Sequence, residues 1–311
     1  MTAEILVPGH IMDSVHEALD AAFTVHYLEA GEGRAAQLAE VGPRVRGIAL
    51  HGVCDAALMD ACPNLEIVSS FGVGYDGVDV AHARGKNIRV CNTPDVLNDA
   101  VAEMTFALMI ALCRKVPQTD QYVRQGLWES EGNYAFTREL TGATVGVLGL
   151  GRIGKEFAAR CQAFKMRVVY HGRNEQAYQP YEYYADLEEM AMASDYLVCI
   201  APGGPSTQGI ISRKVLEALG PEGALVSIGR GSSVDQEALI ELLQSGALGG
   251  AALDVFADEP RVPEALRGMD NVVLSPHQGS ATHKTRWAMG DLVVRNLKAH
   301  FAGEPLISPV V

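Results

Sequence analysis

The first hundred residues alternate short apolar runs with amphipathic stretches. The apolar runs are expected to form strands at 5–7, 25–28, 47–50 and 65–69. Helical periodicity separates them near 11–22, 34–41 and 55–61. Parallel strands need long connections, usually helices, so this alternation predicts a parallel sheet with crossover helices.

A long, almost wholly apolar segment follows at 95–116, with the letters DVLNDAVAEMTFALMIALCRKV. Thr93, Pro94 and Asp95 are residues that favour the start of a helix. A helix that is apolar on nearly every face is buried. We therefore expect one helix over 95–116 in a core or a subunit interface.

A second series of strands and helices begins after a polar stretch with scattered aromatic residues at 126–140. Its six expected strands are 144–148, 167–170, 196–200, 224–228, 250–253 and 272–274. Such a series predicts a doubly wound sheet. The last helical stretch, about 282–302, follows the final strand, so it could cross back and pack on the first domain.

Composition narrows the class of protein. The chain has 311 residues, 48% of them hydrophobic, which is enough for two domains. Its net charge of −13 argues against nucleic acid and anionic membranes as partners. The six cysteines show no C-x-x-C spacing and are interpreted as reduced core residues without a metal. The start of the chain has no basic segment before an apolar one, so we expect a cytoplasmic protein.

The segment at 145–154 is an apolar strand that leads into a G-x-G-x-x-G turn and a helix. Gly149 is expected to make the tight turn, Gly151 to let the backbone approach a pyrophosphate, and Gly154 to allow close packing of helix and strand. The helix would also direct its N-terminal amides at the phosphates. This context predicts a dinucleotide cofactor.

The choice of cofactor depends on the end of the second strand of this sheet. NAD-binding sheets place an acidic residue there, about 20 residues past the glycine turn, whereas this chain continues with Gly172, Arg173 and Asn174. A guanidinium and an amide suit a 2′-phosphate, so NADP(H) is expected to be preferred. Alternatively, Arg173 is merely solvated, Glu175 turns back to the ribose, and NAD(H) is used.

Three further strand ends carry polar residues. Arg230 follows one strand, Asp254 ends the next with Glu259 five positions on, and His277 follows the last. Each could be structural, as a solvated charge, a surface loop residue or a satisfied histidine. Because ligands bind at the carboxyl edge of such sheets, the residues together predict an acid, its orienting partner and an anion clamp.

These motifs resemble the D-isomer-specific 2-hydroxyacid dehydrogenase family. The resemblance rests on residues 149–154, IGRG at 228–231, LDVFADEP at 253–260 and SPHQGSAT at 275–282. It extends from FGVGYDGVD at 71–79 to VVRNLKAHFAGEPL near the C-terminus, and is weakest over 1–65. Within the family, the chain looks most like the glyoxylate/hydroxypyruvate reductase branch.

The resemblance implies an α/β fold with a Rossmann cofactor domain at 99–281. A smaller, discontinuous flavodoxin-like substrate domain would comprise 1–98 and 282–311. The helix at 95–116 would serve as a hinge and dimer element, and the family's homodimer is expected here. Closure of the domains over a cleft would exclude water from the reaction.

The resemblance also assigns roles to residues. His277 would be the general acid, Glu259 would orient it and keep it protonated, and Arg230 would bind the substrate. Val73 and Gly74 would bind the substrate carboxylate through their amides. Asp254 would face the nicotinamide carboxamide, or else would only cap a turn. The expected cofactor contacts are Gly149, Leu150, Gly151, Arg152, Ile153, Gly154, Gly172, Arg173, Asn174, Ile228, Arg230, Asp254 and Gly279.

The expected function is NADPH-preferring reduction of small 2-keto acids, of the glyoxylate or hydroxypyruvate type, to D-2-hydroxy acids. The alternatives are a phosphoglycerate-type dehydrogenase and a corepressor-like protein that senses nicotinamide. Glu259 counts against a formate dehydrogenase, which pairs its histidine with glutamine. His51 either lines the substrate side or is solvated. Thr105 is left outside the catalytic set, and the aromatic residues Trp128, Tyr134 and Phe136 are expected to pack in an interface.

Overall fold

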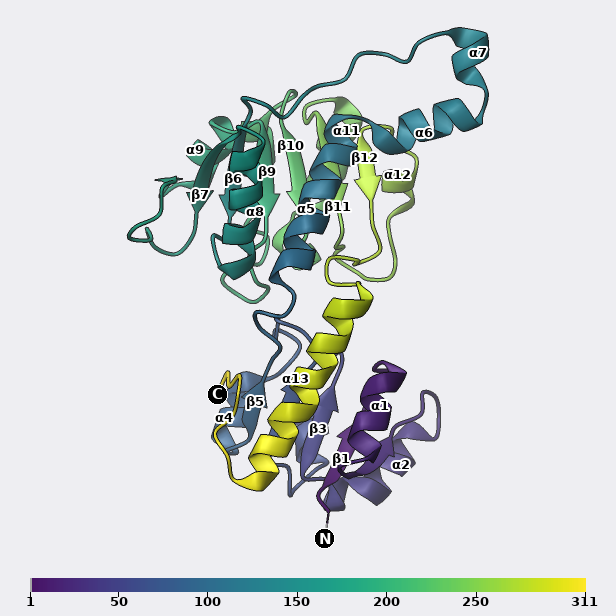
Figure 1. Cartoon of the computed structure of the whole chain (residues 1–311), viewed down its shortest axis with the longest axis vertical. Coiled ribbons are helices and arrows are strands. Elements are labelled where there is room, and N and C mark those ends of the chain that lie inside the picture. Colours follow the sequence, from purple (N-terminus) through teal and green to yellow (C-terminus); the bar gives the residue numbers. More distant parts are fainter. Residues whose placement is uncertain (1) are drawn as a thin grey trace. The chain divides into compact units, whose positions relative to one another are not determined.

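The computed structural model describes residues 2–311 and divides into two compact units (Figure 1). Unit 1 runs to Leu97 and resumes with Ala281–Val311, and unit 2 is Asn98–Ser280. The boundaries lie one residue from those expected for the two domains. No helix within residues 2–311 combines the length and apolarity that a membrane crossing requires.

Unit 1 contains a five-stranded parallel sheet with the strand order β2-β1-β3-β4-β5. Its strands are β1 (Glu4–Val7), β2 (Thr24–Tyr27), β3 (Gly47–Leu50), β4 (Ile67–Ser70) and β5 (Arg89–Cys91). This is the flavodoxin-like order that the resemblance implied. The sequence did not predict β5, which is only three residues long.

The helices of unit 1 follow the expected crossovers. They are α1 (Asp13–Asp20), α2 (Arg34–Val41), η1 (Gly42–Arg44), α3 (Ala56–Asp60), α4 (Val80–Gly85) and α13 (His283–Ala302). The helix α13 packs against α1 and β4, and the Ser69 hydroxyl donates to the carbonyl of Val293 at 3.2 Å. The last helix therefore packs on the first domain, as predicted.

Unit 2 contains a seven-stranded parallel sheet with the order β12-β11-β10-β9-β6-β7-β8. Its strands are β6 (Thr144–Leu148), β7 (Arg167–His171), β8 (Glu182–Tyr183), β9 (Tyr196–Cys199), β10 (Ala224–Ser227), β11 (Gly250–Leu253) and β12 (Val272–Leu274). Six correspond to predicted strands, and the two-residue β8 does not. The doubly wound sheet is confirmed.

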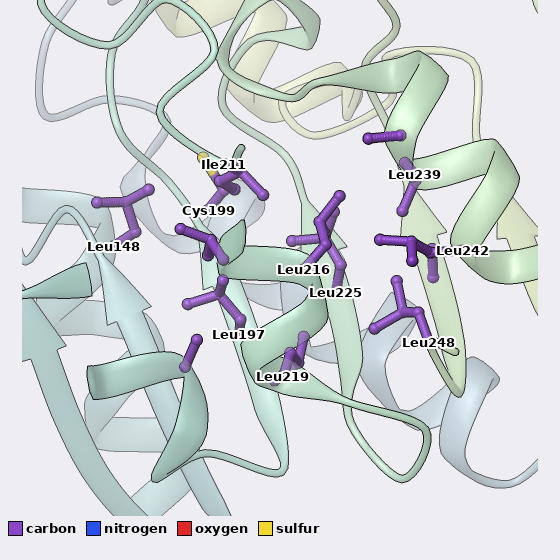
Figure 2. Packing of buried hydrophobic residues seen from close by; sticks show 14 of the residues in the cluster. Leu148, Leu197, Cys199, Ile211, Leu216, Leu219, Leu225, Leu239, Leu242 and Leu248 are labelled. Carbon is purple, nitrogen blue, oxygen red and sulfur yellow. The ribbon is translucent and has the colours of Figure 1, made fainter. Parts of the chain in front are cut away.

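The helices of unit 2 cover both faces of this sheet. They are α5 (Asn98–Cys113), α6 (Val116–Arg124), α7 (Leu127–Glu131), α8 (Arg152–Ala163), α9 (Leu187–Met192), α10 (Arg213–Leu219), η2 (Gly231–Ser233), α11 (Gln236–Ser245) and α12 (Glu264–Arg267). Figure 2 shows leucines of α10 and α11 beside leucines of β9 and β10: Leu216, Leu219, Leu239, Leu242, Leu197 and Leu225. All six cysteines of the chain are buried and free, as predicted.

The prediction of a single helix over 95–116 was wrong about both ends of the helix. The helix α5 begins only at Asn98, because Asp95 adopts a left-handed backbone conformation with φ 69°. The helix α5 ends at Cys113. Lys115 has a left-handed backbone conformation, with φ 52°, and separates α5 from α6. Figure 1 shows α6 and α7 extending away from the sheet of unit 2.

Candidate active site

The glycine turn after β6 has the backbone that its sequence predicted. Gly149 has φ +100°, and a Cβ there would lie 2.9 Å from the nitrogen of Ala201. At Gly154 a Cβ would lie 2.4 Å from the carbonyl oxygen of Gly149. At Gly151, in contrast, a Cβ would meet no atom within 4 Å. The turn thus combines tight packing on one side with open space where a ligand can approach.

The N-terminus of α8 is suited to an anion. Its N-cap, Gly151, provides no side-chain cap, and no acidic residue lies in the first turn. The first amides of a helix lack intrahelical acceptors and carry the positive end of the helix dipole. The open space at Gly151 therefore fits the pyrophosphate of a dinucleotide.

The loop after β7 carries Arg173 and Asn174, both exposed. Within residues 2–311, Arg173 has no ion-pair partner. Gln176 fixes this loop to the glycine turn: its Nε2 donates to the carbonyl of Leu150 at 2.7 Å, and the hydroxyl of Tyr170 accepts from its backbone N–H at 2.7 Å. Sequence reasoning missed Gln176 because nothing in the local pattern marks a contact across 26 residues.

His277 and Glu259 form a direct pair. The distance from His277 Nδ1 to Glu259 Oε2 is 2.7 Å, and Glu259 Oε1 accepts from the Phe256 N–H at 3.0 Å. Burial raises the pKa of the Glu259 carboxyl, but these two hydrogen bonds and the charges of His277 and Arg230 outweigh burial and lower it. The ionised carboxylate can only accept, so Nδ1 donates and Nε2 faces away from the pair.

Asp254 holds the turn that carries His277. Its Oδ1 accepts from the Gln278 N–H at 2.7 Å and its Oδ2 from the Gly279 N–H at 2.8 Å. The His277 N–H donates to the Asp254 carbonyl at 2.9 Å. His277 has a left-handed backbone, with φ 54°, which persists only where surrounding contacts enforce it. Asp254 thus caps the turn, which was the structural alternative, and its contact with nicotinamide stays a prediction.

Arg230 follows β10 at the same edge of the sheet. Its Nη1 donates to the Gly229 carbonyl at 2.9 Å. A Cβ on Gly231 would come within 1.9 Å of the Phe256 backbone, so only glycine allows this segment to lie so close to the Glu259 loop. The charge of Arg230 contributes to the lowered pKa of Glu259, so unit 2 brings Arg230, Glu259 and His277 together.

In unit 1, the loop after β4 offers two backbone donors. The carbonyl of Gly72 accepts from the Thr93 N–H at 2.9 Å, and the carbonyl of Val73 accepts from Asn92 Nδ2 at 2.8 Å. The N–H groups of Val73 and Gly74 find no acceptor anywhere in residues 2–311. Adjacent unpaired amides can bind a carboxylate. Asn92, which fixes this loop, was missed because its role depends on a contact between two strand ends.

Other residues considered from the sequence lie elsewhere. Thr105 is fully buried and donates to the Val101 carbonyl of its own helix at 2.6 Å. Trp128 and Phe136 are 61% and 107% exposed. In the described chain, residues 2–311, no group of three or more His, Cys, Asp or Glu side chains is arranged to hold a metal ion.

Comparison with known proteins decides the family. The profile of the D-isomer specific 2-hydroxyacid dehydrogenase, NAD binding domain, matches residues 106–279, more than half of the chain. Hydroxyphenylpyruvate reductase from Plectranthus scutellarioides is 50% identical over 257 residues, which are 83% of this chain and 82% of that protein. The chain belongs to the D-isomer specific 2-hydroxyacid dehydrogenase family.

Two further relatives cover nearly the whole dehydrogenase. 2-Ketogluconate reductase from Gluconobacter oxydans is 39% identical over 99% of this chain and 98% of its own length. A second relative is an NADPH-dependent glyoxylate/hydroxypyruvate reductase from Sinorhizobium meliloti, whose crystal structure is in complex with NADP and malonate. Its sequence is 46% identical to this chain, and the two structures superpose with a TM-score of 0.96. It covers 100% of this chain and 97% of that one. The predicted family, its glyoxylate/hydroxypyruvate reductase-like branch and the reduction of 2-keto acids are thus confirmed.

A pH profile tests the histidine–glutamate pair of the dehydrogenase. Because the pKa of Glu259 lies below its ordinary value of 4.5, the carboxylate stays ionised throughout the neutral range. We expect E259Q to move the alkaline limb of kcat/KM for keto-acid reduction to lower pH, since an imidazolium without an anionic partner loses its proton more readily. D258N, at an exposed neighbouring carboxylate paired with Arg261, is the control and should leave the limb in place. An unmoved limb in E259Q would separate Glu259 from the titrating group.

Proposed function

We propose that this dehydrogenase reduces small 2-keto acids of the glyoxylate and hydroxypyruvate type to D-2-hydroxy acids, with NADPH preferred over NADH. The observation that carries the proposal is the 2.7 Å contact between His277 and Glu259 beside Arg230. A proton donor, its anionic partner and a substrate-binding cation are the groups that reduction of a 2-keto acid requires.

The glycine turn at 149–154 and the N-terminus of α8 would hold the dinucleotide, whose nicotinamide would supply the hydride for the keto carbon. His277 donates its Nε2 proton to the keto oxygen as negative charge develops there, and the C=O double bond becomes C–OH. Glu259 holds the imidazole through Nδ1 and stabilises its protonated form. Arg230 binds the substrate carboxylate and carbonyl oxygen with its fork of donors.

The ligand groups are assigned to each unit by itself. We assign the substrate carboxylate to the N–H groups of Val73 and Gly74 in unit 1, in the loop whose Gly72 and Val73 carbonyls already accept hydrogen bonds. We assign the dinucleotide to unit 2, with its pyrophosphate at Gly151 and the N-terminus of α8. This division makes residues 1–98 with 282–311 the substrate domain and 99–281 the cofactor domain.

The preference for NADPH rests on the loop after β7. No acidic residue ends that strand, and the exposed Arg173 and Asn174 follow it. Gln176 fixes the loop to the glycine turn, so Arg173 belongs to the same ligand surface as the pyrophosphate site. The Sinorhizobium meliloti relative, which is described as NADPH-dependent, supports this assignment.

Arg173 can be tested directly. We expect R173A to lower kcat/KM for NADPH by about 10- to 150-fold, the loss of about 1.5–3 kcal/mol from charge-assisted bonds to phosphate, and to leave NADH nearly unaffected. R167A is the matched control, because Arg167 begins the same strand and pairs with Glu182 at 2.5 Å. A parent protein that prefers NADH, or an R173A variant that loses both cofactors equally, would overturn the assignment.

We further propose that the chain acts as a homodimer in the cytoplasm. The exposed apolar side chains of the segment at 116–137, among them Val123, Trp128 and Phe136, would be covered by a second copy. Six free, buried thiols suit a reducing compartment. Sedimentation equilibrium should give twice the 33.3 kDa of one chain, and a monomer would refute the dimer.

The substrate class is tested by initial rates over a panel of keto acids. Glyoxylate, hydroxypyruvate, pyruvate and bulkier 2-keto acids are each measured with NADPH and with NADH. We expect turnover of glyoxylate and hydroxypyruvate, faster with NADPH at limiting concentration. Binding of nicotinamide without turnover of any keto acid would contradict the proposed function.

A further inference from the structure

The segment of residues 172–176, which follows β7, is held at both ends by tyrosine hydroxyl groups. At its start, the hydroxyl of Tyr183 donates to the carbonyl of Gly172 at 3.2 Å. At its end, the hydroxyl of Tyr170 accepts from the backbone N–H of Gln176 at 2.7 Å. The mechanism above gives neither tyrosine a role.

The two tyrosines lie beside each other on neighbouring strands. Tyr170 of β7 and Tyr183 of β8 are partners in the parallel register, and their ring centroids are 5.3 Å apart. The ring of Tyr183 also stacks on that of His171, with the centroids 6.5 Å apart and an angle of 10° between the planes. Tyr170 is only 1% exposed. The two-residue strand β8 therefore holds Tyr183 against β7, where its hydroxyl reaches Gly172.

The residues between the two held ends are open to a ligand. Arg173 and Asn174 are exposed, and a Cβ on Gly172 would meet no atom within 4 Å. In the part of the chain that the structure describes, residues 2–311, no acidic side chain forms an ion pair with Arg173. The position of its guanidinium therefore depends on the backbone of 172–176, and so on the two hydroxyl groups that hold this backbone.

A segment that is ordered before its ligand arrives binds that ligand more tightly. Fixing the backbone of a loop costs conformational entropy, and a loop that is already held has lost this entropy before binding. The 2′-phosphate is the group that NADP(H) has and NAD(H) lacks. Ordering of Arg173 and Asn174 should therefore strengthen the binding of NADP(H) much more than that of NAD(H).

We propose that Tyr170 and Tyr183 are positioning residues for the choice of cofactor: their hydroxyl groups hold 172–176 so that Arg173 and Asn174 meet the 2′-phosphate. The inference rests on the proposed function, since it assumes that the 2′-phosphate binds at Arg173. It adds that the preference for NADPH depends on two hydroxyl groups that act through the backbone of the loop.

The test measures the dissociation constants of NADP⁺ and NAD⁺ by calorimetric titration, without a keto acid. Y170F and Y183F each remove one hydroxyl and keep the ring. We expect the ratio of Kd for NAD⁺ to Kd for NADP⁺ to fall by roughly three- to tenfold in each variant, the value of one hydrogen bond. Amide hydrogen exchange over 172–176 in the free protein should be faster in both variants.

A second pair of variants separates positioning from a general effect on the fold. In an R173A background, Y170F and Y183F should leave the ratio nearly unchanged, because they act through Arg173. Y184F is the matched control. Tyr184 directly follows Tyr183, but its hydroxyl interacts with Arg167 at the start of β7, so this variant should keep the parental ratio.

Three results would overturn the inference: a parental ratio in both Y170F and Y183F, an equal fall of the ratio when Arg173 is already absent, or the same fall in Y184F. If one of the two tyrosine variants does not fold, the other decides. A parent protein that binds NAD⁺ as tightly as NADP⁺ would instead refute the proposed preference for NADPH, and the inference with it.

Discussion

H277A is expected to lower kcat/KM for keto-acid reduction by about 10²- to 10⁴-fold, the usual contribution of a positioned proton donor. The reason is geometric: Glu259 holds Nδ1 at 2.7 Å, and Asp254 binds the backbone N–H groups of His277 and of the two residues after it, so the ring presents Nε2 in one orientation. Cofactor affinity should change little, because the histidine acts on the keto oxygen. Steady-state kinetics together with titration of NADPH binding measure both.

H82A provides a control of the same chemical type. His82 also pairs with a carboxylate, that of Asp60 at 2.9 Å, but it lies on α4 of unit 1 and belongs to no proposed site. Its removal should leave kcat/KM within twofold of the parent. Activity of H277A within tenfold of the parent would exclude His277 as the general acid.

R230K should reduce kcat/KM for glyoxylate by about 10- to 150-fold although it keeps the charge. A lysine ammonium is a point cation and cannot form two parallel bonds to a carboxylate or to a carboxylate and a carbonyl oxygen. The loss corresponds to about 1.5–3 kcal/mol for a hydrogen bond to a charged group. Initial rates over a range of glyoxylate concentrations, at saturating NADPH, provide the measurement.

R261K is the matched control for this substitution. Arg261 makes a two-pronged contact with Asp258, with both distances 2.7 Å, and both side chains are exposed. Exposed ion pairs of this kind contribute little to stability, so R261K should behave as the parent does. Near-parental kcat/KM in R230K would show that Arg230 does not contact the substrate.

Sequence patterns predicted much of this fold because the two sheets are buried. Six of the seven strands of unit 2 are apolar runs that can be recognised in the sequence. The spacing of the glycines at 149–154 indicates where the backbone needs a positive φ or close packing. The exceptions are β5 and β8, which are too short to produce a pattern. The predicted ends of α5 were wrong because Asp95 and Lys115 adopt left-handed backbone conformations, which cannot be predicted from these residue types.

The candidate site was predictable where a motif marks it and not where a tertiary contact forms it. Arg230, Glu259 and His277 each follow a strand, so the topology of a parallel sheet brings them to one edge. Gln176 and Asn92 act through carbonyl groups far away in the sequence. No local periodicity encodes such contacts.

The most direct test is the reduction of hydroxypyruvate by the unmodified protein. The rate is measured from the oxidation of NADPH, and the product is identified by chiral analysis. The account predicts stoichiometric formation of D-glycerate, with a higher kcat/KM for NADPH than for NADH. Formation of L-glycerate, or no oxidation of NADPH while the nucleotide binds, would contradict it.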